Sequence, residues 1–90
     1  MIEDEPRLLL VYFWQPACEP CRELRPQLEE VLESQPDMCR GVSLDVDAEP
    51  QAAIAHGIRR TPTVAFFKGG REVHRFHGGA LPPSLRTMVG

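Results

Sequence analysis

The sequence predicts an α/β protein in which a central mixed β-sheet of about four strands is flanked by helices, in the order β-α-β-α-β-β-α. Three patterns favour this class. Residues 7–13 form an unbroken apolar run typical of a strand buried on both faces. Apolar residues then recur at helical spacing between residues 18 and 34, and a two-glycine turn separates two strand-like segments near residue 69. Ninety residues are too few for two domains, so we expect a single domain over residues 1–90.

The elements can be justified in chain order. A helix is expected from residue 18 to about 34, with Pro20 in its first turn and Pro26 inside it, where we expect a kink. Alternating apolar and polar residues at 42–46 indicate a second strand, and Pro50 opens a short helix over 51–56. Segments 63–67 and 72–76 form a β-hairpin, and residues 81–89 are predicted to form a last helix.

Charge and hydropathy exclude several functions. The 13 acidic and 10 basic side chains give a net charge of -3, and the basic residues are scattered, which argues against nucleic acid as a partner. No apolar run approaches the roughly 18 residues of a membrane span, so we expect no membrane partner. The acidic start of the chain does not resemble a secretory signal, which predicts a cytoplasmic protein.

The segment Cys18-Glu19-Pro20-Cys21 carries the clearest chemistry. It opens a helix directly after a buried strand, and a helix N-terminus favours the thiolate form of a cysteine. The three-residue offset brings the second sulfur within reach of the first across one helical turn. We therefore expect Cys18, nearer the helix tip, to be the exposed nucleophile and Cys21 to be the shielded thiol that resolves a mixed disulfide.

The sequence resembles the thioredoxin family over nearly its whole length. Residues 13–22, FWQPACEPCR, are similar to the family's active-site segment, and Pro26 falls at the position of the family's helix proline. The strand end at 45–47, the stretch 57–63 (GIRRTPT) and the hairpin turn at 67–70 match in the same order. The resemblance implies a thioredoxin-like fold that lacks the first strand and helix of a full thioredoxin.

The resemblance also implies an activity and a site. The expected reaction is reduction of protein disulfides, with electrons from a reductase or a small thiol and with no bound cofactor. Pro62 would be a cis-proline that shapes the substrate groove, and Thr61 would offer main-chain contacts to the substrate. Trp14 would supply apolar surface beside the cysteines.

The residues expected to tune the redox pair are Tyr12, Glu19 and Pro20, and two of them, Tyr12 and Glu19, depart from the family pattern. Tyr12 stands where thioredoxins carry a buried Asp that helps to move the proton of the resolving thiol, and a Tyr does not ionise easily near neutral pH. Ala17 replaces the usual Trp before the first cysteine. Glu19 replaces the usual Gly, and its carboxylate should raise the pKa of the nucleophile.

Other functions remain open at this point. The departures are compatible with a redox-poor binding or assembly module, and the short chain with a glutathione-dependent enzyme. A small metal-binding domain would need the two thiolates together with Cys39 or some of the three histidines, but no second closely spaced cysteine pair exists, so we expect no metal. Cys39 is expected to be a half-buried free thiol. An exposed sheet edge would leave the oligomeric state open between a monomer and a homodimer.

Overall fold

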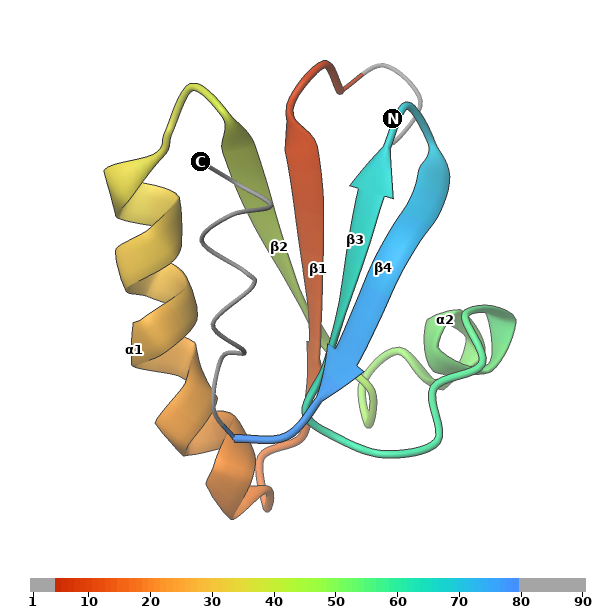
Figure 1. Ribbon diagram of the computed structural model, residues 1–90. Helices are drawn as coiled ribbons and strands as arrows, with labels where there is room; N and C mark the ends of the chain where they lie inside the picture. The colour runs from red at the N-terminus through yellow and green to blue at the C-terminus, as the bar shows by residue number, and fades with distance from the viewer. Residues whose placement is uncertain (1–4, 80–90) are drawn as a thin grey trace.

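The computed structural model describes residues 5–79, and the helix expected over 81–89 lies outside this range. The elements are β1 (Leu8–Trp14), α1 (Glu19–Ser34), β2 (Cys39–Asp45), α2 (Pro50–Ala55), β3 (Thr63–Lys68) and β4 (Arg71–His77) (Figure 1). This order confirms the predicted succession as far as the last strand. Neither helix of the described part of the chain is long and apolar enough to cross a membrane.

The four strands form one mixed sheet in the order β2-β1-β3-β4. β1 pairs in parallel with β2 and antiparallel with β3, and β4 pairs antiparallel with β3. Because β1 lies inside the sheet and both of its faces are covered, every residue from Leu8 to Phe13 is at most 9% exposed. The unbroken apolar run in the sequence thus corresponds to the innermost part of the fold.

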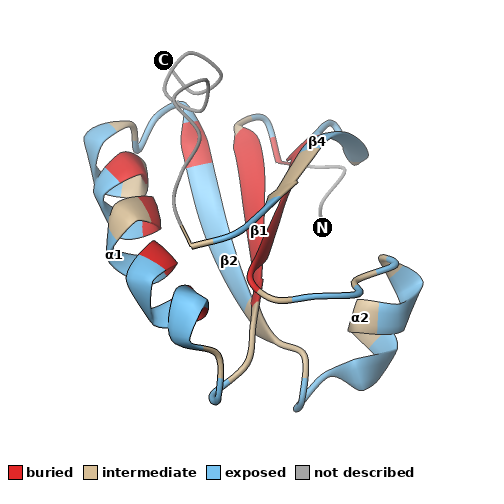
Figure 2. Cartoon of the chain, turned by 60° about the horizontal axis from the view of Figure 1, so that its bottom comes forward, coloured by how far each residue is buried: buried red, intermediate tan, exposed pale blue. Residues whose placement is uncertain are grey.

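The helices lie on opposite sides of the sheet (Figures 1 and 2). α1 turns its apolar residues Leu24, Leu28 and Val31 toward one face, where they form a buried cluster with alternate residues of β1 and β3. The other face, on the side of α2, carries the second cluster, which comprises Leu9, Val11, Phe13, Ala65 and Phe67. The alternation along β1 therefore divides one strand between two cores.

α1 runs through Pro26, which lies on its exposed side, as one element. Details of the next two elements differ from expectation. The second strand begins at Cys39, because this residue pairs with Leu8 at the start of β1. The expectation of a half-buried Cys39 is therefore wrong, since it is a free thiol that is only 2% exposed. The short helix begins and ends one residue earlier than predicted.

The β3–β4 hairpin is confirmed. Its two turn residues, Gly69 and Gly70, have φ angles of 59° and 83°. Positive φ at both central positions is typical of the tight turn whose twist matches that of paired strands, and glycine adopts it without steric cost. The hairpin returns the chain along β3, so that β4 ends beside the loop that precedes β3.

Candidate active site

The two cysteines of the CEPC segment form a disulfide at the beginning of α1. Cys18 is the N-cap residue, and its Sγ accepts a hydrogen bond of 3.2 Å from the backbone N–H of Cys21. The two Cα atoms are 5.2 Å apart. Cys18 is half-buried whereas Cys21 is only 2% exposed, as expected for an outer and an inner sulfur.

The local sequence explains this placement. After β1 a short turn brings the chain back, with the N–H of Cys18 donating to the carbonyl of Gln15 at 3.2 Å. Pro20 lies in the first turn of α1, where its missing N–H costs no helical hydrogen bond. Glu19 is exposed and pairs with Arg22 at 3.3 Å, so its carboxylate lies at the helix N-terminus but is partly neutralised. The free N–H groups of this helix end favour negative charge on a sulfur placed there.

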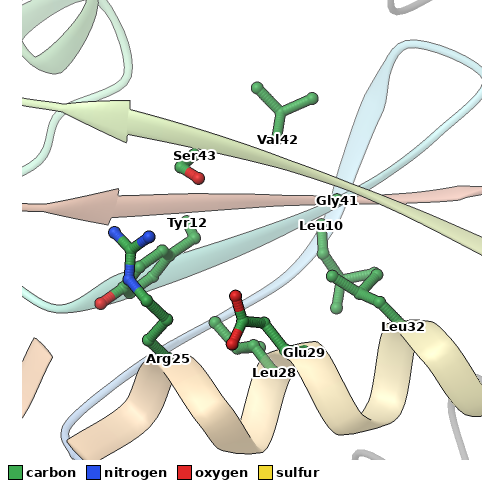
Figure 3. Close-up of a pocket in the computed structure, with 9 residues that line it drawn as sticks. All are labelled: Leu10, Tyr12, Arg25, Leu28, Glu29, Leu32, Gly41, Val42 and Ser43. Atoms are coloured by element: carbon green, nitrogen blue, oxygen red, sulfur yellow. The ribbon is translucent and has the colours of Figure 1, made fainter. Parts of the chain in front are cut away.

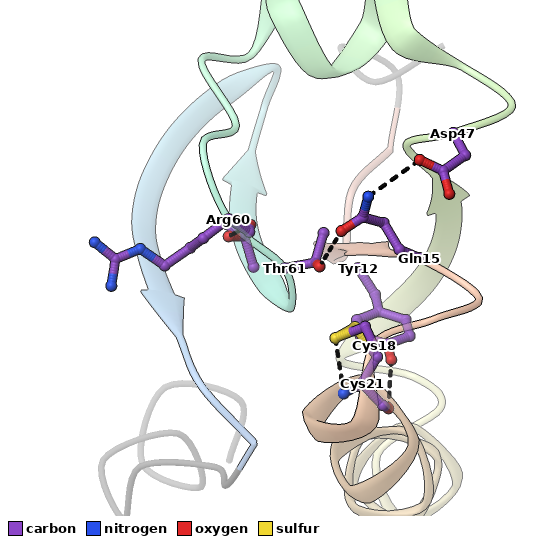
Figure 4. The surroundings of a disulfide bond; sticks show 8 residues. Tyr12, Gln15, Cys18, Cys21, Asp47, Arg60 and Thr61 are labelled. Carbon is purple, nitrogen blue, oxygen red and sulfur yellow. Dashed lines mark hydrogen bonds between the residues drawn. A yellow bond between two sulfur atoms is a disulfide. The ribbon is translucent and has the colours of Figure 1, made fainter.

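The loop before β3 faces the disulfide. The Thr61–Pro62 peptide bond is cis, as the family resemblance implies, and Pro62 is buried. The Thr61 hydroxyl donates to Oε1 of Gln15 at 2.7 Å, and the Gln15 amide nitrogen donates to Oδ1 of Asp47 at 3.1 Å (Figure 4). These bonds join the ends of β1 and β2 to the cis-proline loop around Cys18.

The sequence pattern did not predict Gln15 and Asp47 as residues of the site. Both are polar residues that follow adjacent strands, Gln15 after β1 and Asp47 after β2. Because parallel strands bring their carboxyl ends to the same edge of the sheet, polar residues that directly follow such strands can be predicted to lie close together. A hollow of about 310 Å³ lies next to this network. Its lining includes Gln15, Asp47, Ile54, Ile58 and Thr61.

Tyr12 lies under the inner cysteine. Tyr12 is 6% exposed, and its hydroxyl donates a 2.6 Å hydrogen bond to the backbone carbonyl of Cys21 (Figure 4). Burial raises the pKa of Tyr12, although the neighbouring positive charge of Arg25 opposes that shift. Because the neutral hydroxyl donates to a backbone carbonyl, Tyr12 stabilises the first turn of α1. Trp14 and Cys18 both pack, partly buried, against the cluster to which Tyr12 belongs.

The histidines take no part in this site. His56 contacts the rings of Phe13 and Phe67 on the other face of the sheet, with ring centroids 5.7 Å apart in each pair. His74 contacts Phe66, and Nδ1 of His77 lies 2.8 Å from the hydroxyl of Thr63. Among residues 5–79 no three His, Cys, Asp or Glu side chains are grouped so as to hold a metal ion.

A mixed four-stranded sheet that ends in a cysteine pair able to form a disulfide at a helix N-terminus is the arrangement of a thiol-disulfide oxidoreductase. The family model described as Thioredoxin matches residues 1–89. The chain belongs to the thioredoxin family.

Individual relatives agree with this assignment. The chain is 40% identical to Thioredoxin 1 of Nostoc sp. over 81 residues, which cover 90% of this chain and 75% of that protein. The X-ray structure of Fasciola hepatica thioredoxin superimposes with a TM-score of 0.85 at 33% identity, over 97% of this chain and 82% of the other. The chain is also 30% identical over 89 residues to NADPH-dependent thioredoxin reductase 3 of Arabidopsis thaliana, covering 99% of this chain and 17% of that protein.

Proposed function

We propose that this oxidoreductase reduces disulfides of other proteins, with Cys18 as the attacking thiol and Cys21 as the resolving thiol. The observation that carries the proposal is the arrangement of the pair, in which the outer sulfur caps the helix and the inner sulfur is buried one turn behind it. In the reduced protein, the N–H that now contacts Cys18 Sγ would stabilise a thiolate at this position.

The reaction then proceeds in two exchanges. The Cys18 thiolate attacks one sulfur of the substrate disulfide, so a mixed disulfide forms and the other substrate sulfur leaves as a thiolate that takes up a proton. Cys21 loses its proton and attacks Cys18 Sγ, which forms the Cys18–Cys21 disulfide and releases the second substrate thiol. Two electrons pass from the cysteine pair to the substrate.

The substrate is proposed to lie along the loop that holds Thr61 and Pro62. The side chain of Thr61 is engaged by Gln15, whereas its backbone N–H and carbonyl have no hydrogen-bond partner among residues 5–79. These groups are suited to pair with an extended substrate segment. Trp14 would add apolar surface at the site, and Glu19, Pro20 and Tyr12 would set the redox properties of the pair.

Reduction of the resulting disulfide requires an electron donor, for which we propose a thioredoxin reductase or a small thiol. One relative of this chain is named as a thioredoxin reductase and contains a segment of this kind, which favours the first donor. We propose the cytoplasm as the compartment, because a protein that reduces disulfides works where thiols are kept reduced. The free thiol of Cys39 is compatible with that setting.

The test is reduction of insulin with dithiothreitol as the electron source. Wild-type protein should accelerate insulin precipitation, whereas Cys18→Ser should be inactive. In a separate incubation of pre-reduced protein from which dithiothreitol has been removed, Cys21→Ser should accumulate a mixed disulfide with the substrate, because attack can occur without resolution. Cys39→Ser is the matched control and should retain activity. Wild-type activity no faster than the reagent alone would contradict the proposed function, and trapping by Cys18→Ser instead of Cys21→Ser would reverse the assigned roles.

A further inference from the structure

Arg25 lies across the two aromatic residues beneath the cysteine pair. It is four residues after Cys21 on α1, and its guanidinium carbon is 4.9 Å from the centre of the Trp14 ring and 5.6 Å from that of Tyr12. Such distances are typical of a cation attracted to the faces of aromatic rings. Arg25 is thus directed back over β1 and toward the turn that holds the inner sulfur.

This position places a positive charge about one helical turn after the inner cysteine. Side chains four residues apart on a helix are neighbours, with Cβ atoms about 6 Å apart, so Arg25 and Cys21 share one face of α1. Tyr12 connects them, because its ring contacts Arg25 and its hydroxyl bonds to the Cys21 carbonyl. Burial raises the pKa of Tyr12, and the positive charge of Arg25 opposes that rise, as expected for a cation placed beside this ring.

Several charged groups surround the cysteine pair, and Arg25 is the one that contacts the two aromatic residues beneath it. Asp47 and Arg60 lie around the disulfide on the side of the cis-proline loop (Figure 4). Arg25 lines a hollow of about 170 Å³ between α1 and the sheet (Figure 3). The sheet contributes neutral side chains to this hollow, Tyr12 and Leu10 from β1 and Ser43 from β2. Glu29 is the opposing charge and lies one turn further from the cysteines. The exposed Glu19 and Arg22 at the start of α1 pair with each other.

We propose that the positive charge of Arg25 stabilises the thiolate that forms when the cysteine pair is reduced. The inference rests on the proposed redox function of Cys18 and Cys21. A thiolate exists only after the disulfide is reduced, whereas the disulfide itself is neutral. Arg25 therefore favours the reduced form and makes the cysteine pair a stronger oxidant than it would be without this charge.

The pH dependence distinguishes this role from simple packing. At a pH well below the thiol pKa, both cysteines are protonated and the charge of Arg25 has little to stabilise. As the pH rises through the thiol pKa, the thiolate forms and the effect reaches its full size. A purely structural contribution of Arg25 would instead change the equilibrium by a similar factor at each pH.

The experiment measures the equilibrium in which the protein disulfide and two reduced glutathione molecules give the protein dithiol and one glutathione disulfide. The redox state is quantified by alkylation and mass measurement, because Trp14 fluorescence would itself respond to changes at Arg25. Wild type is compared with Arg25→Met, which removes the charge, and with Arg25→Lys, which retains it. Arg71→Gln is the matched control, since it removes one exposed positive charge at the distant hairpin turn.

Arg25→Met should shift the equilibrium toward the disulfide by roughly threefold to tenfold above the thiol pKa, and much less below it. A tenfold change corresponds to about 30 mV. The pKa of Cys18, followed by thiolate absorbance, should rise in the same variant, whereas Arg25→Lys and Arg71→Gln should stay close to wild type. An Arg25→Met equilibrium equal to wild type, or shifted equally at every pH, would overturn the proposal. Insulin reduction by wild type tests the proposed function separately.

Discussion

Tyr12 shows how one side chain changes the chemistry expected of this site. Thioredoxins carry at this position a carboxylate that helps to move the proton of the resolving thiol, and this chain has Tyr12 instead. In the structure its buried hydroxyl donates to the Cys21 carbonyl. We therefore expect the proton of Cys21 to leave by another route and Tyr12 to contribute by fixing the first turn of α1.

Tyr12→Phe tests this interpretation. The variant retains the ring under Arg25 and loses only the hydroxyl, so the oxidised protein should lose about 1 kcal/mol of unfolding free energy in urea. The pH dependence of insulin reduction should keep its shape, because the hydroxyl does not serve the sulfur. A change in the pH profile without loss of stability would identify Tyr12 as part of the proton route.

Glu19 is the second residue whose effect can be isolated. Glu19→Gly should lower the pKa of Cys18 by a fraction of a unit, because a carboxylate beside the sulfur disfavours the thiolate. The effect is limited, since Glu19 is exposed and paired with Arg22. Glu19→Gln is the matched variant that removes charge without changing the backbone. The pKa of Cys18 is measured by thiolate absorbance, and an unchanged or higher pKa of Cys18 in both variants would refute the prediction.

A cluster of charged side chains joins the starts of the two parallel strands. The Glu5 carboxylate has a side-chain exposure of 7% and accepts hydrogen bonds from Arg7 Nε at 2.8 Å and from Arg40 Nη1 at 3.3 Å. Arg7 precedes β1 and Arg40 belongs to β2. The hydrogen bonds from Arg7 are the main cause that lowers the pKa of Glu5 from 4.5 to about 2. The carboxylate thus helps to hold β2 against the central strand.

Stability should therefore fall in acid. The Glu5 pKa is lower in the folded chain than in the unfolded one, so its contribution is complete above pH 4.5 and is lost as the pH falls toward 2. Urea midpoints measured between pH 7 and pH 2.5 should decline less steeply for Glu5→Gln than for wild type. Glu33→Gln, which removes an exposed carboxylate near the end of α1, should follow the wild-type curve. Parallel curves for wild type and Glu5→Gln would contradict the prediction.

The elements that could be predicted from the sequence are those set by local patterns. Three features can be recognised within a few consecutive residues: the apolar run of β1, the helical period of α1 and the glycines of the hairpin turn. The cysteine pair was also predictable, because both sulfurs lie within one helical turn. By contrast, Gln15 and Asp47 meet only through the parallel pairing of β1 and β2, which no local pattern specifies. The contact of Arg25 with Trp14 likewise depends on which way a long side chain turns.

At the scale of the whole molecule, the redox state should change the stability of the fold. The Cys18–Cys21 bond closes a loop with a sequence separation of only 3, and loops this short remove little entropy from the unfolded chain. The chain-entropy relation gives about 2 kcal/mol. For a protein of this size, reduction should therefore lower Tm by roughly 10 °C.

Calorimetry with and without a reductant measures this difference. Cys18→Ser, which cannot form the bond, should show the same Tm under both conditions. Equal values for oxidised and reduced wild type would show that the unfolded chain gains no freedom when the bond is broken. A decrease in Tm for Cys18→Ser on adding reductant would show that the reagent acts elsewhere in the protein.

The burial of Cys39 gives the molecule a thiol that reports on opening of the structure. Its side chain is 2% exposed at the start of β2, its Sγ donates to the carbonyl of Gln35 at 3.3 Å, and burial raises the pKa of the thiol. A thiol reagent added to the reduced native protein should therefore modify Cys18 quickly and Cys39 only when the start of β2 separates from β1. The rate of this slow modification measures the frequency of that separation, without any label or substitution introduced into the protein.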